Sequence, residues 1–308
     1  MTDNQPARWT RRGFGRILGG AAGLATLGSF SSACGGSSGG SPAAGNVAAS
    51  GSAGAGAVNA VAGASASSSS GSGSAGGGVD ADLLMQRYGL KPFAAAPAAP
   101  AAKAITLDPQ NPTVFSKVPT AEKICFVTID DGIDKDPAFI QMVKDFQIPI
   151  TCSLADTLIK DDYAYFEKLY ETGYVSYQNH TVNHPLSMPS LGYQEQLDEI
   201  AGQQTKLHKE YGVTPYIFRP PGGNYDSVTR EACRAAGLKG MMLWKEAMEI
   251  QDMEYQTSDR HLQTGDIILC HFRGPAQLKG ETMVKMMTHL YSHIQSQGFT
   301  VADVTQYV

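Results

Sequence analysis

Short apolar runs alternate with helix-like segments from residue 124 to the end of the chain. In the helix-like segments the apolar residues recur every three or four positions, which is typical of a helix with one buried face, and short apolar runs are typical of buried strands. The expected strands are 124–129, 148–154, 174–177, 216–218, 240–244, 267–271 and 299–304. The expected helices are 139–146, 163–170, 197–211, 228–236 and 283–294. This alternation predicts an α/β fold with a parallel sheet, either a closed barrel or a doubly wound sheet.

The first third of the chain has a different pattern. Residues 35–79 contain no charged and no aromatic side chain, so this stretch cannot offset the entropy lost on folding. We therefore predict a disordered Gly/Ser/Ala linker over 34–103 and one catalytic domain over 104–308. Within the linker, Leu83, Leu84, Tyr88 and Leu90 favour a short helix that serves as a minor docking segment at most.

The N-terminal residues 1–33 have the pattern of a twin-arginine signal peptide. Arg11 and Arg12 precede a moderately apolar run from Ile17 to Phe30, and small residues suited to cleavage follow. Cys34 comes next, and two outcomes stay open: a lipid anchor on Cys34, or release by ordinary signal peptidase. The apolar run is shorter than the roughly 20 residues that a bilayer requires, so we expect no transmembrane span in the mature protein. An extracellular or cell-surface protein is predicted.

Charge and cysteine content narrow the classes of partner. The chain carries a net charge of −5, and removal of residues 1–33 would leave −8, which argues against nucleic-acid binding and favours a neutral sugar substrate. The cysteines after Cys34 show no zinc-finger spacing. Buried cysteine is most often an apolar filler, and a Cys125–Cys152 bridge between neighbouring strands is the alternative.

Chemically reactive residues follow the predicted strands. Asp131, His180 and His184 offer one carboxylate and two imidazoles to a divalent cation, and the four-residue spacing on a helical turn would bring both imidazoles to one side. Zinc suits this set best, with cobalt, nickel and manganese as alternatives. The neighbouring Asp130 needs its own counter-charge, for which Arg219 is the candidate. His289 and His293 share the four-residue spacing but have no carboxylate motif nearby, so we interpret them as surface residues.

These motifs, together with Arg219-Pro220-Pro221-Gly222-Gly223-Asn224-Tyr225 and Leu269-Cys270-His271, resemble the polysaccharide deacetylases, the family-four carbohydrate esterases, from about residue 104 to the end. The resemblance implies an irregular (β/α) barrel with about seven parallel strands and a site at its C-terminal mouth. It implies that Asp130 is the general base and His271 the general acid. It also implies that the backbone N–H of Gly222 donates a hydrogen bond to the oxyanion. The residues expected to line the substrate pocket are Leu269, Trp244, Pro221 and Tyr225.

One motif departs from the family pattern. An aspartate-containing motif that holds the arginine commonly follows the tryptophan, whereas here Trp244 is followed by Lys245-Glu246-Ala247-Met248-Glu249-Ile250-Gln251-Asp252. Glu246, Glu249 or Asp252 could replace the missing aspartate as the partner of the arginine by reaching further, and Glu246 is the preferred candidate.

These observations predict an exported, metal-dependent hydrolase that removes acetyl groups from a polysaccharide. The expected substrate is the N-acetyl group of amino sugars in peptidoglycan or a chitin-type polymer. An O-acetyl esterase acting on acetylated xylan or a similar glycan uses the same machinery and stays open. A carbohydrate-binding protein with impaired catalysis is the third alternative, motivated by the altered motif after Trp244.

Overall fold

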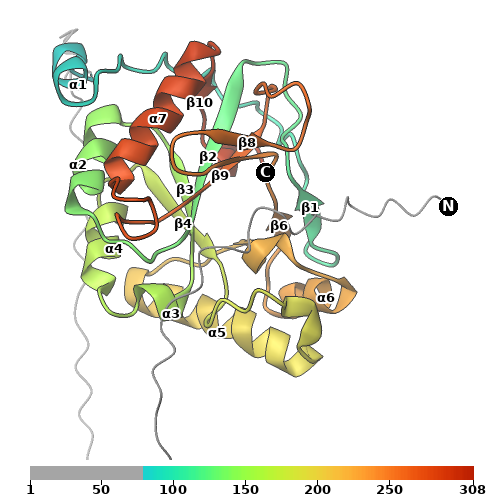
Figure 1. The fold of residues 1–308 in the computed structure, drawn as a ribbon. Helices are drawn as coiled ribbons and strands as arrows, with labels where there is room; N and C mark the ends of the chain where they lie inside the picture. The colour runs from blue at the N-terminus through green and yellow to red at the C-terminus, as the bar shows by residue number, and fades with distance from the viewer. Residues whose placement is uncertain (1–78) are drawn as a thin grey trace, which may run out of the picture. The chain divides into compact units, whose positions relative to one another are not determined.

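The computed structural model describes residues 79–308, which fold around one curled sheet (Figure 1). The strand order is β1-β6-β5-β4-β3-β2-β9-β7-β8, with β10 paired to β2. Neighbouring strands are parallel except β7 and β8, which form an antiparallel pair. The strands are β1 (Thr113–Phe115), β2 (Ile124–Asp131), β3 (Ile150–Leu154), β4 (Val175–Asn179), β5 (Ile217–Phe218), β6 (Gly240–Met242), β7 (Glu246–Met248), β8 (Met253–Tyr255), β9 (Ile267–His271) and β10 (Thr300–Val301). The predicted α/β barrel architecture is confirmed, in the form of an open half-barrel.

Helices cover the outside of this sheet and follow one another around it in the order α7, α2, α4, α5, α6. The helices are α1 (Ala81–Tyr88), α2 (Pro137–Phe146), α3 (Asp156–Ile159), α4 (Tyr163–Tyr170), α5 (Tyr193–Tyr211), α6 (Ser227–Ala235) and α7 (Met283–Ser296). Side-chain caps define where they start: Asp136, Asp162, Asp226 and Thr282 each accept a hydrogen bond from a backbone N–H of the first turn.

Strand β2 is buried along its whole length because helices cover its outer face and the barrel interior covers the other. Val127 and Ile129 belong to the outer core, with apolar residues of α2 and α7. Phe126 belongs to the inner core, with Ile267 and Leu269 of β9. Side chains alternate along a strand, so Thr128 and Asp130 share the inward direction of Phe126. This alternation aims the reactive side chains into the barrel mouth.

The segment before residue 104 packs on the domain. In α1, Leu84 is fully buried, and Arg87 forms an ion pair of 2.8 Å with Asp145. The ring of Phe93 meets Tyr291 of α7 at a centroid distance of 5.5 Å. The short helix predicted around Leu84 is present, and residues 79–103 contribute to the core of the same compact unit. The twin-arginine motif, Cys34 and most of the Gly/Ser/Ala stretch lie outside the described residues.

The four cysteines of residues 79–308 are buried and free, so the alternative of a Cys125–Cys152 bridge is wrong. The strand register explains why: Cys152 on β3 lies opposite Ile129. Cys125 is four residues further back along β2, about 13 Å away at the usual rise of a strand, and a disulfide spans only about 7 Å between Cα atoms. Within the described part of the chain, no helix combines the length and apolar character needed to cross a bilayer.

Candidate metal and catalytic site

Four strand ends bring the candidate residues together at one edge of the sheet. Asp131 ends β2, His180 follows β4, Arg219 follows β5 and His271 ends β9. The register of β2 and β9 places Asp130 directly beside His271. Because parallel strands end at the same side of a barrel, these residues meet at its C-terminal mouth, where such folds hold their sites.

Asp131, His180 and His184 form a compact set of ligand atoms. All three lie within 4.8 Å of one another, with Asp131 Oδ1 at 3.1 Å from His184 Nε2 and 3.5 Å from His180 Nε2. His180 Nδ1 contacts the carbonyl oxygen of Arg219 at 2.6 Å, which fixes the tautomer and leaves Nε2 for a cation. The residues present therefore fit a divalent metal ion.

The electrostatics of this set also favour a cation. Burial by itself would raise the pKa of Asp131, but hydrogen bonds from His180 and His184 outweigh it and hold that pKa well below its usual range. Burial by itself would lower the pKa of His180, but the carboxylates of Asp130 and Asp131 outweigh it and raise that pKa. The buried carboxylates thus draw positive charge to the place where the ligand atoms converge.

The histidine pair lies on a loop and not on the helical turn that the spacing predicted, so that expectation was wrong. Thr181 and His184 have positive φ angles of 71° and 56°, which a helix does not allow. Two local hydrogen bonds hold this backbone: the side chain of Asn179 accepts from the Thr181 N–H, and the Thr181 hydroxyl accepts from the His184 N–H, both at 3.0 Å.

Helix α5 supports the same loop from outside. The carboxylate of Glu199 accepts hydrogen bonds from the backbone N–H and the side-chain amide of Asn183, both at 2.8 Å. The Glu199 carbonyl oxygen accepts from the N–H of Val182 at 3.1 Å. One glutamate therefore fixes the loop segment that joins the two imidazoles.

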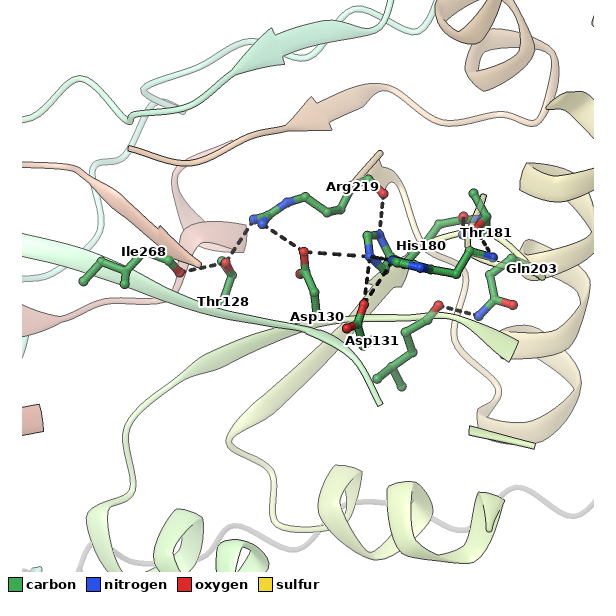
Figure 2. A network of polar contacts seen from close by, with 11 residues as sticks. Thr128, Asp130, Asp131, His180, Thr181, Gln203, Arg219 and Ile268 are labelled. Carbon is green, nitrogen blue, oxygen red and sulfur yellow. Dashed lines mark hydrogen bonds and ion pairs between the residues drawn. The ribbon is translucent and has the colours of Figure 1, made fainter. Parts of the chain in front are cut away.

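Arg219 is the counter-charge of Asp130, as the sequence predicted. Its guanidinium is fully buried and donates to Asp130 Oδ2 at 3.2 Å and to the Thr128 hydroxyl at 3.0 Å (Figure 2). The Thr128 hydroxyl in turn donates to the carbonyl oxygen of Ile268. Burial lowers the pKa of Arg219, and the neighbouring Asp130 opposes that shift. Asp130, only 2% exposed, is therefore held by a fixed positive charge.

His271 and Leu269 share the inward face of β9. Leu269 packs in the inner core, whereas Cys270 between them belongs to the outer core, as predicted from strand alternation. Burial lowers the pKa of His271 to about 4. Its Nδ1 atom is buried and has no hydrogen-bond partner among residues 79–308. The imidazole is therefore neutral at neutral pH.

In the turn after Arg219, the backbone lies close to neighbouring side chains. Two prolines follow the arginine, so Gly222 supplies the first backbone N–H after it. Gly222 and Gly223 have φ angles of 61° and 71°. A Cβ atom on Gly222 would lie 3.0 Å from Asn224 Nδ2, and one on Gly223 would lie 3.0 Å from the Trp244 ring. Glycine at both positions therefore allows this turn to lie directly on its neighbours.

A family model described as polysaccharide deacetylase matches residues 117–241, which include the three candidate ligands and Arg219. An uncharacterized protein of Streptomyces coelicolor is 33% identical over 235 residues, covering 73% of this chain and 92% of that protein. This chain belongs to the polysaccharide deacetylase family. The peptidoglycan-N-acetylglucosamine deacetylase of Bacillus cereus is 23% identical over 203 residues, covering 62% of this chain and 92% of that enzyme.

Solved structures of family-four carbohydrate esterases share the fold. A peptidoglycan N-acetylglucosamine deacetylase superposes with a TM-score of 0.53 at 17% identity, covering 63% of this chain and 91% of that chain. A family-four pseudoenzyme from Bacillus anthracis has the same TM-score at 16% identity, covering 64% of this chain and 69% of that chain. At these identities the likeness supports the deacetylase fold alone.

Glu246 does not replace the missing aspartate of the deacetylase pattern. Ala247 packs in the inner core, so its neighbour Glu246 points to the outer side of β7. Burial, followed by the nearby Asp266, raises the pKa of Glu246 to about 9. Glu249 contacts Arg273 at 3.7 Å. Among the described residues, Asp130 supplies the single carboxylate in an ion pair with Arg219.

The residues predicted to line the substrate pocket differ in burial and in their neighbours. Pro221 is buried in the turn, and Trp244 is only 5% exposed. Tyr225 packs against the core between α5 and α6 and borders a surface hollow with Gln110, Asn111 and Arg230. Pocket lining by these residues stays a prediction.

His289 and His293 lie on α7, and each contacts other side chains of the protein. His289 lies 3.4 Å from Glu281, and His293 contacts the Tyr255 hydroxyl and Gln297. Both are partly buried, so their interpretation as surface residues was only partly right.

The supporting roles of Thr128 and Asn179 were not identified from the sequence, because a buried hydroxyl or amide has no distinctive spacing.

Proposed function

We propose that this protein is a metal-dependent deacetylase that removes N-acetyl groups from amino sugars of peptidoglycan or a chitin-type polymer. The convergence of Asp131, His180 and His184 beside the buried Asp130 carries the proposal. A divalent cation held by these three side chains, zinc by preference, would polarise the acetyl carbonyl and lower the pKa of the attacking water. The family supports an acetylated polysaccharide as substrate, and the Bacillus cereus relative supports the N-acetyl group.

Asp130 is the proposed general base. Its carboxylate lies 3.9 Å from His180 Nε2, next to the converging ligands, and its other contact is the Arg219 guanidinium. Oδ1 of Asp130 is buried and has no hydrogen-bond partner among residues 79–308. A carboxylate oxygen without a donor can accept the proton of a water molecule that attacks the acetyl carbon.

His271 and Gly222 are proposed to act on the leaving group and on the oxyanion, respectively. The Gly222 N–H would stabilise the oxyanion because the rigid Pro220-Pro221 segment fixes its direction. Negative charge developing on the substrate would raise the pKa of the neutral His271, so that its imidazole takes up a proton from solvent and then passes this proton to the leaving amine. Leu269 would seat the acetyl methyl group.

Two exposed aliphatic side chains flank the ligands and are proposed to contact the sugar rings. Ile133, two residues after Asp131, is 39% exposed, and Leu186, two residues after His184, is 49% exposed. The side-chain amide of Asn224 donates to the Leu186 carbonyl oxygen at 2.8 Å, which fixes this residue beside Gly222. The apolar C–H face of a pyranose ring fits such a surface.

The O-acetyl esterase and the binding protein are the competing functions. The ester reaction needs the same base and acid, and the bifunctional xylanase/xylan deacetylase of Cellvibrio japonicus is 26% identical over 153 residues. The protein from Bacillus anthracis that shares the fold is described as a pseudoenzyme, so the fold is compatible with the absence of catalysis. The twin-arginine motif fits a substrate outside the cell, and export is part of the proposal.

Acetate release tests the proposed function. Purified protein is incubated with N-acetylglucosamine oligomers, peptidoglycan and acetylated xylan, before and after chelation and with Zn²⁺ restored. We expect release from the N-acetylated glycans that stops with the chelator and returns with the metal. Release from xylan alone would establish the esterase. No release from any glycan by metal-loaded protein would reject both enzyme functions.

A further inference from the structure

Arg219 is buried with few polar partners. Its guanidinium makes one carboxylate contact, with Asp130 at 3.2 Å, and one hydroxyl contact, with Thr128 at 3.0 Å. The Nε atom is buried and has no hydrogen-bond partner among the described residues. A buried cation that keeps a defined position needs further compensation, because desolvation costs several kcal/mol per ion.

Strand β7 does not supply a second carboxylate to Arg219, because the residue that faces inward on it is Ala247. The sheet register places Ala247 beside Leu269, and Leu269 beside Thr128, in one row across three strands. Thr128 in this row accepts from Arg219, so an acidic side chain at position 247 would share the inner face with the guanidinium. The residue there is an alanine, and only its methyl group faces inward.

The ring of Trp244 lies against the guanidinium instead. Arg219 Cζ is 5.3 Å from the centre of the ring, within the range of a cation–π interaction. One edge of the ring lies close to the turn, since a Cβ atom on Gly223 would be 3.0 Å from Cη2 of the ring. The side-chain amide of Gln256 also donates to the Trp244 carbonyl oxygen at 2.8 Å. Trp244 is therefore held between Arg219 and the turn that follows it.

We propose that Trp244 is a positioning residue: its ring holds Arg219 against Asp130, the role that a carboxylate would otherwise fill. This assignment rests on the proposed function and departs from a pocket-lining role for Trp244. Because the ring acts through Arg219 on the base and not on the substrate, its loss changes the chemical step and leaves substrate binding intact.

Variants of Trp244 test the assignment in the metal-loaded protein. We expect Trp244→Leu to lower kcat roughly thirtyfold with little change in KM, and Trp244→Phe, which keeps a ring, to lose less. Phe115→Leu is the matched control, since Phe115 lies in the same inner core. Adding Ala247→Asp to Trp244→Leu should restore part of kcat by supplying a carboxylate. Equal losses for Trp244→Leu and Phe115→Leu, or a raised KM with unchanged kcat, would overturn the proposal.

Fluorescence gives a readout that does not need activity. The chain has two tryptophans, so Trp9→Phe leaves Trp244 as the single tryptophan, whose emission selective excitation separates from that of tyrosine. Arg219→Met should shift the emission of Trp244, whereas Lys117→Met, which removes a cation paired with Asp266, should not. If Arg219→Met leaves the emission wavelength of Trp244 unchanged, the contact between the two side chains is refuted, even if the protein is inactive on every glycan. Absence of acetate release with a clear shift would instead reject only the proposed function.

Discussion

Two adjacent aspartates have separate tasks because the backbone turns between them. Asp130 keeps the inward direction of β2 and meets Arg219, whereas Asp131 has a φ of 81° and meets the two imidazoles. Asp130 thereby has a fixed positive partner in Arg219, and Asp131 has the imidazoles as hydrogen-bond partners, which reduces the repulsion expected for neighbouring carboxylates.

Replacement of Asp130 by asparagine should separate catalysis from metal binding. The amide cannot accept the proton, so we expect kcat to fall by about 10²–10⁴-fold. Metal content should stay at one ion per chain, because the three ligands are untouched. Asp131→Asn is the comparison variant and should lose both metal and activity. Full activity of metal-loaded Asp130→Asn, measured by acetate release, would refute the role of the base.

The types of the site residues were predictable from sequence, but their local backbone was not. Motif order identified Asp131, His180 and His184 as one set. The positive φ angles of Thr181 and His184 depend on hydrogen bonds that the loop donates to Asn179 and to Glu199 of α5, and no spacing rule encodes these bonds. The support of Arg219 by Trp244 likewise depends on the packing of the β5 and β7 ends, which are distant in sequence.

At the level of elements, long amphipathic helices and fully apolar strands were predicted well. The bounds expected for Tyr163–Tyr170 and Ile267–His271 agree with α4 and β9. Strands β7 and β8 were missed because each has a glutamate among its three residues and so does not form an apolar run, and β1 was missed because it lies before the region of alternating strands and helices. Missing β7 also hid the fact that Glu246 faces outward.

The loop between the two histidines depends on α5 through Glu199. We expect Glu199→Ala to weaken metal affinity by roughly tenfold or more, because the backbone and side chain of Asn183 lose their acceptor. Asp198→Ala on the same helix is the control, since Asp198 bonds to the exposed Gln194. Metal titration in a competing chelator measures the difference, and equal affinities in the two variants would contradict it.

Strand β7 carries a group that makes stability depend on pH. The pKa of Glu246 is about 9 in the folded protein, above its ordinary value of 4.5. An unfolded chain releases this proton near 4.5, so the folded state loses stability as pH rises from there to about 9. Glu246→Gln has no proton to lose. It should therefore be more stable than the wild type by on the order of 2–4 kcal/mol at pH 8 and similar to it at pH 4.

Denaturant unfolding at several pH values checks this prediction. The difference in unfolding free energy between Glu246→Gln and the wild type should grow as pH rises. A difference that stays constant from pH 4 to 8 would show that Glu246 keeps no abnormal pKa.

For the whole molecule, a bound metal would join two segments that are far apart in the chain. Asp131 ends β2, and His180 and His184 follow β4, so a bound cation would link strand ends on either side of β3. Binding to the folded state alone contributes about 2.7 kcal/mol when free metal is a hundred times Kd, so chelation should lower Tm by roughly 5–10 °C. Differential scanning calorimetry measures the shift. Asp131→Asn should melt at the same temperature with or without chelator.

The ends of the barrel have different neighbours. The segment 79–99 packs near Phe146, Ile148 and Val175, at the amino ends of β3 and β4, while the candidate ligands follow the carboxyl ends of β2 and β4. The chain therefore enters the domain at the end opposite the metal ligands. A bead, chip or affinity resin coupled at Val79 would leave the candidate catalytic mouth open to large insoluble glycans, which makes immobilised protein a workable reagent for solid substrates.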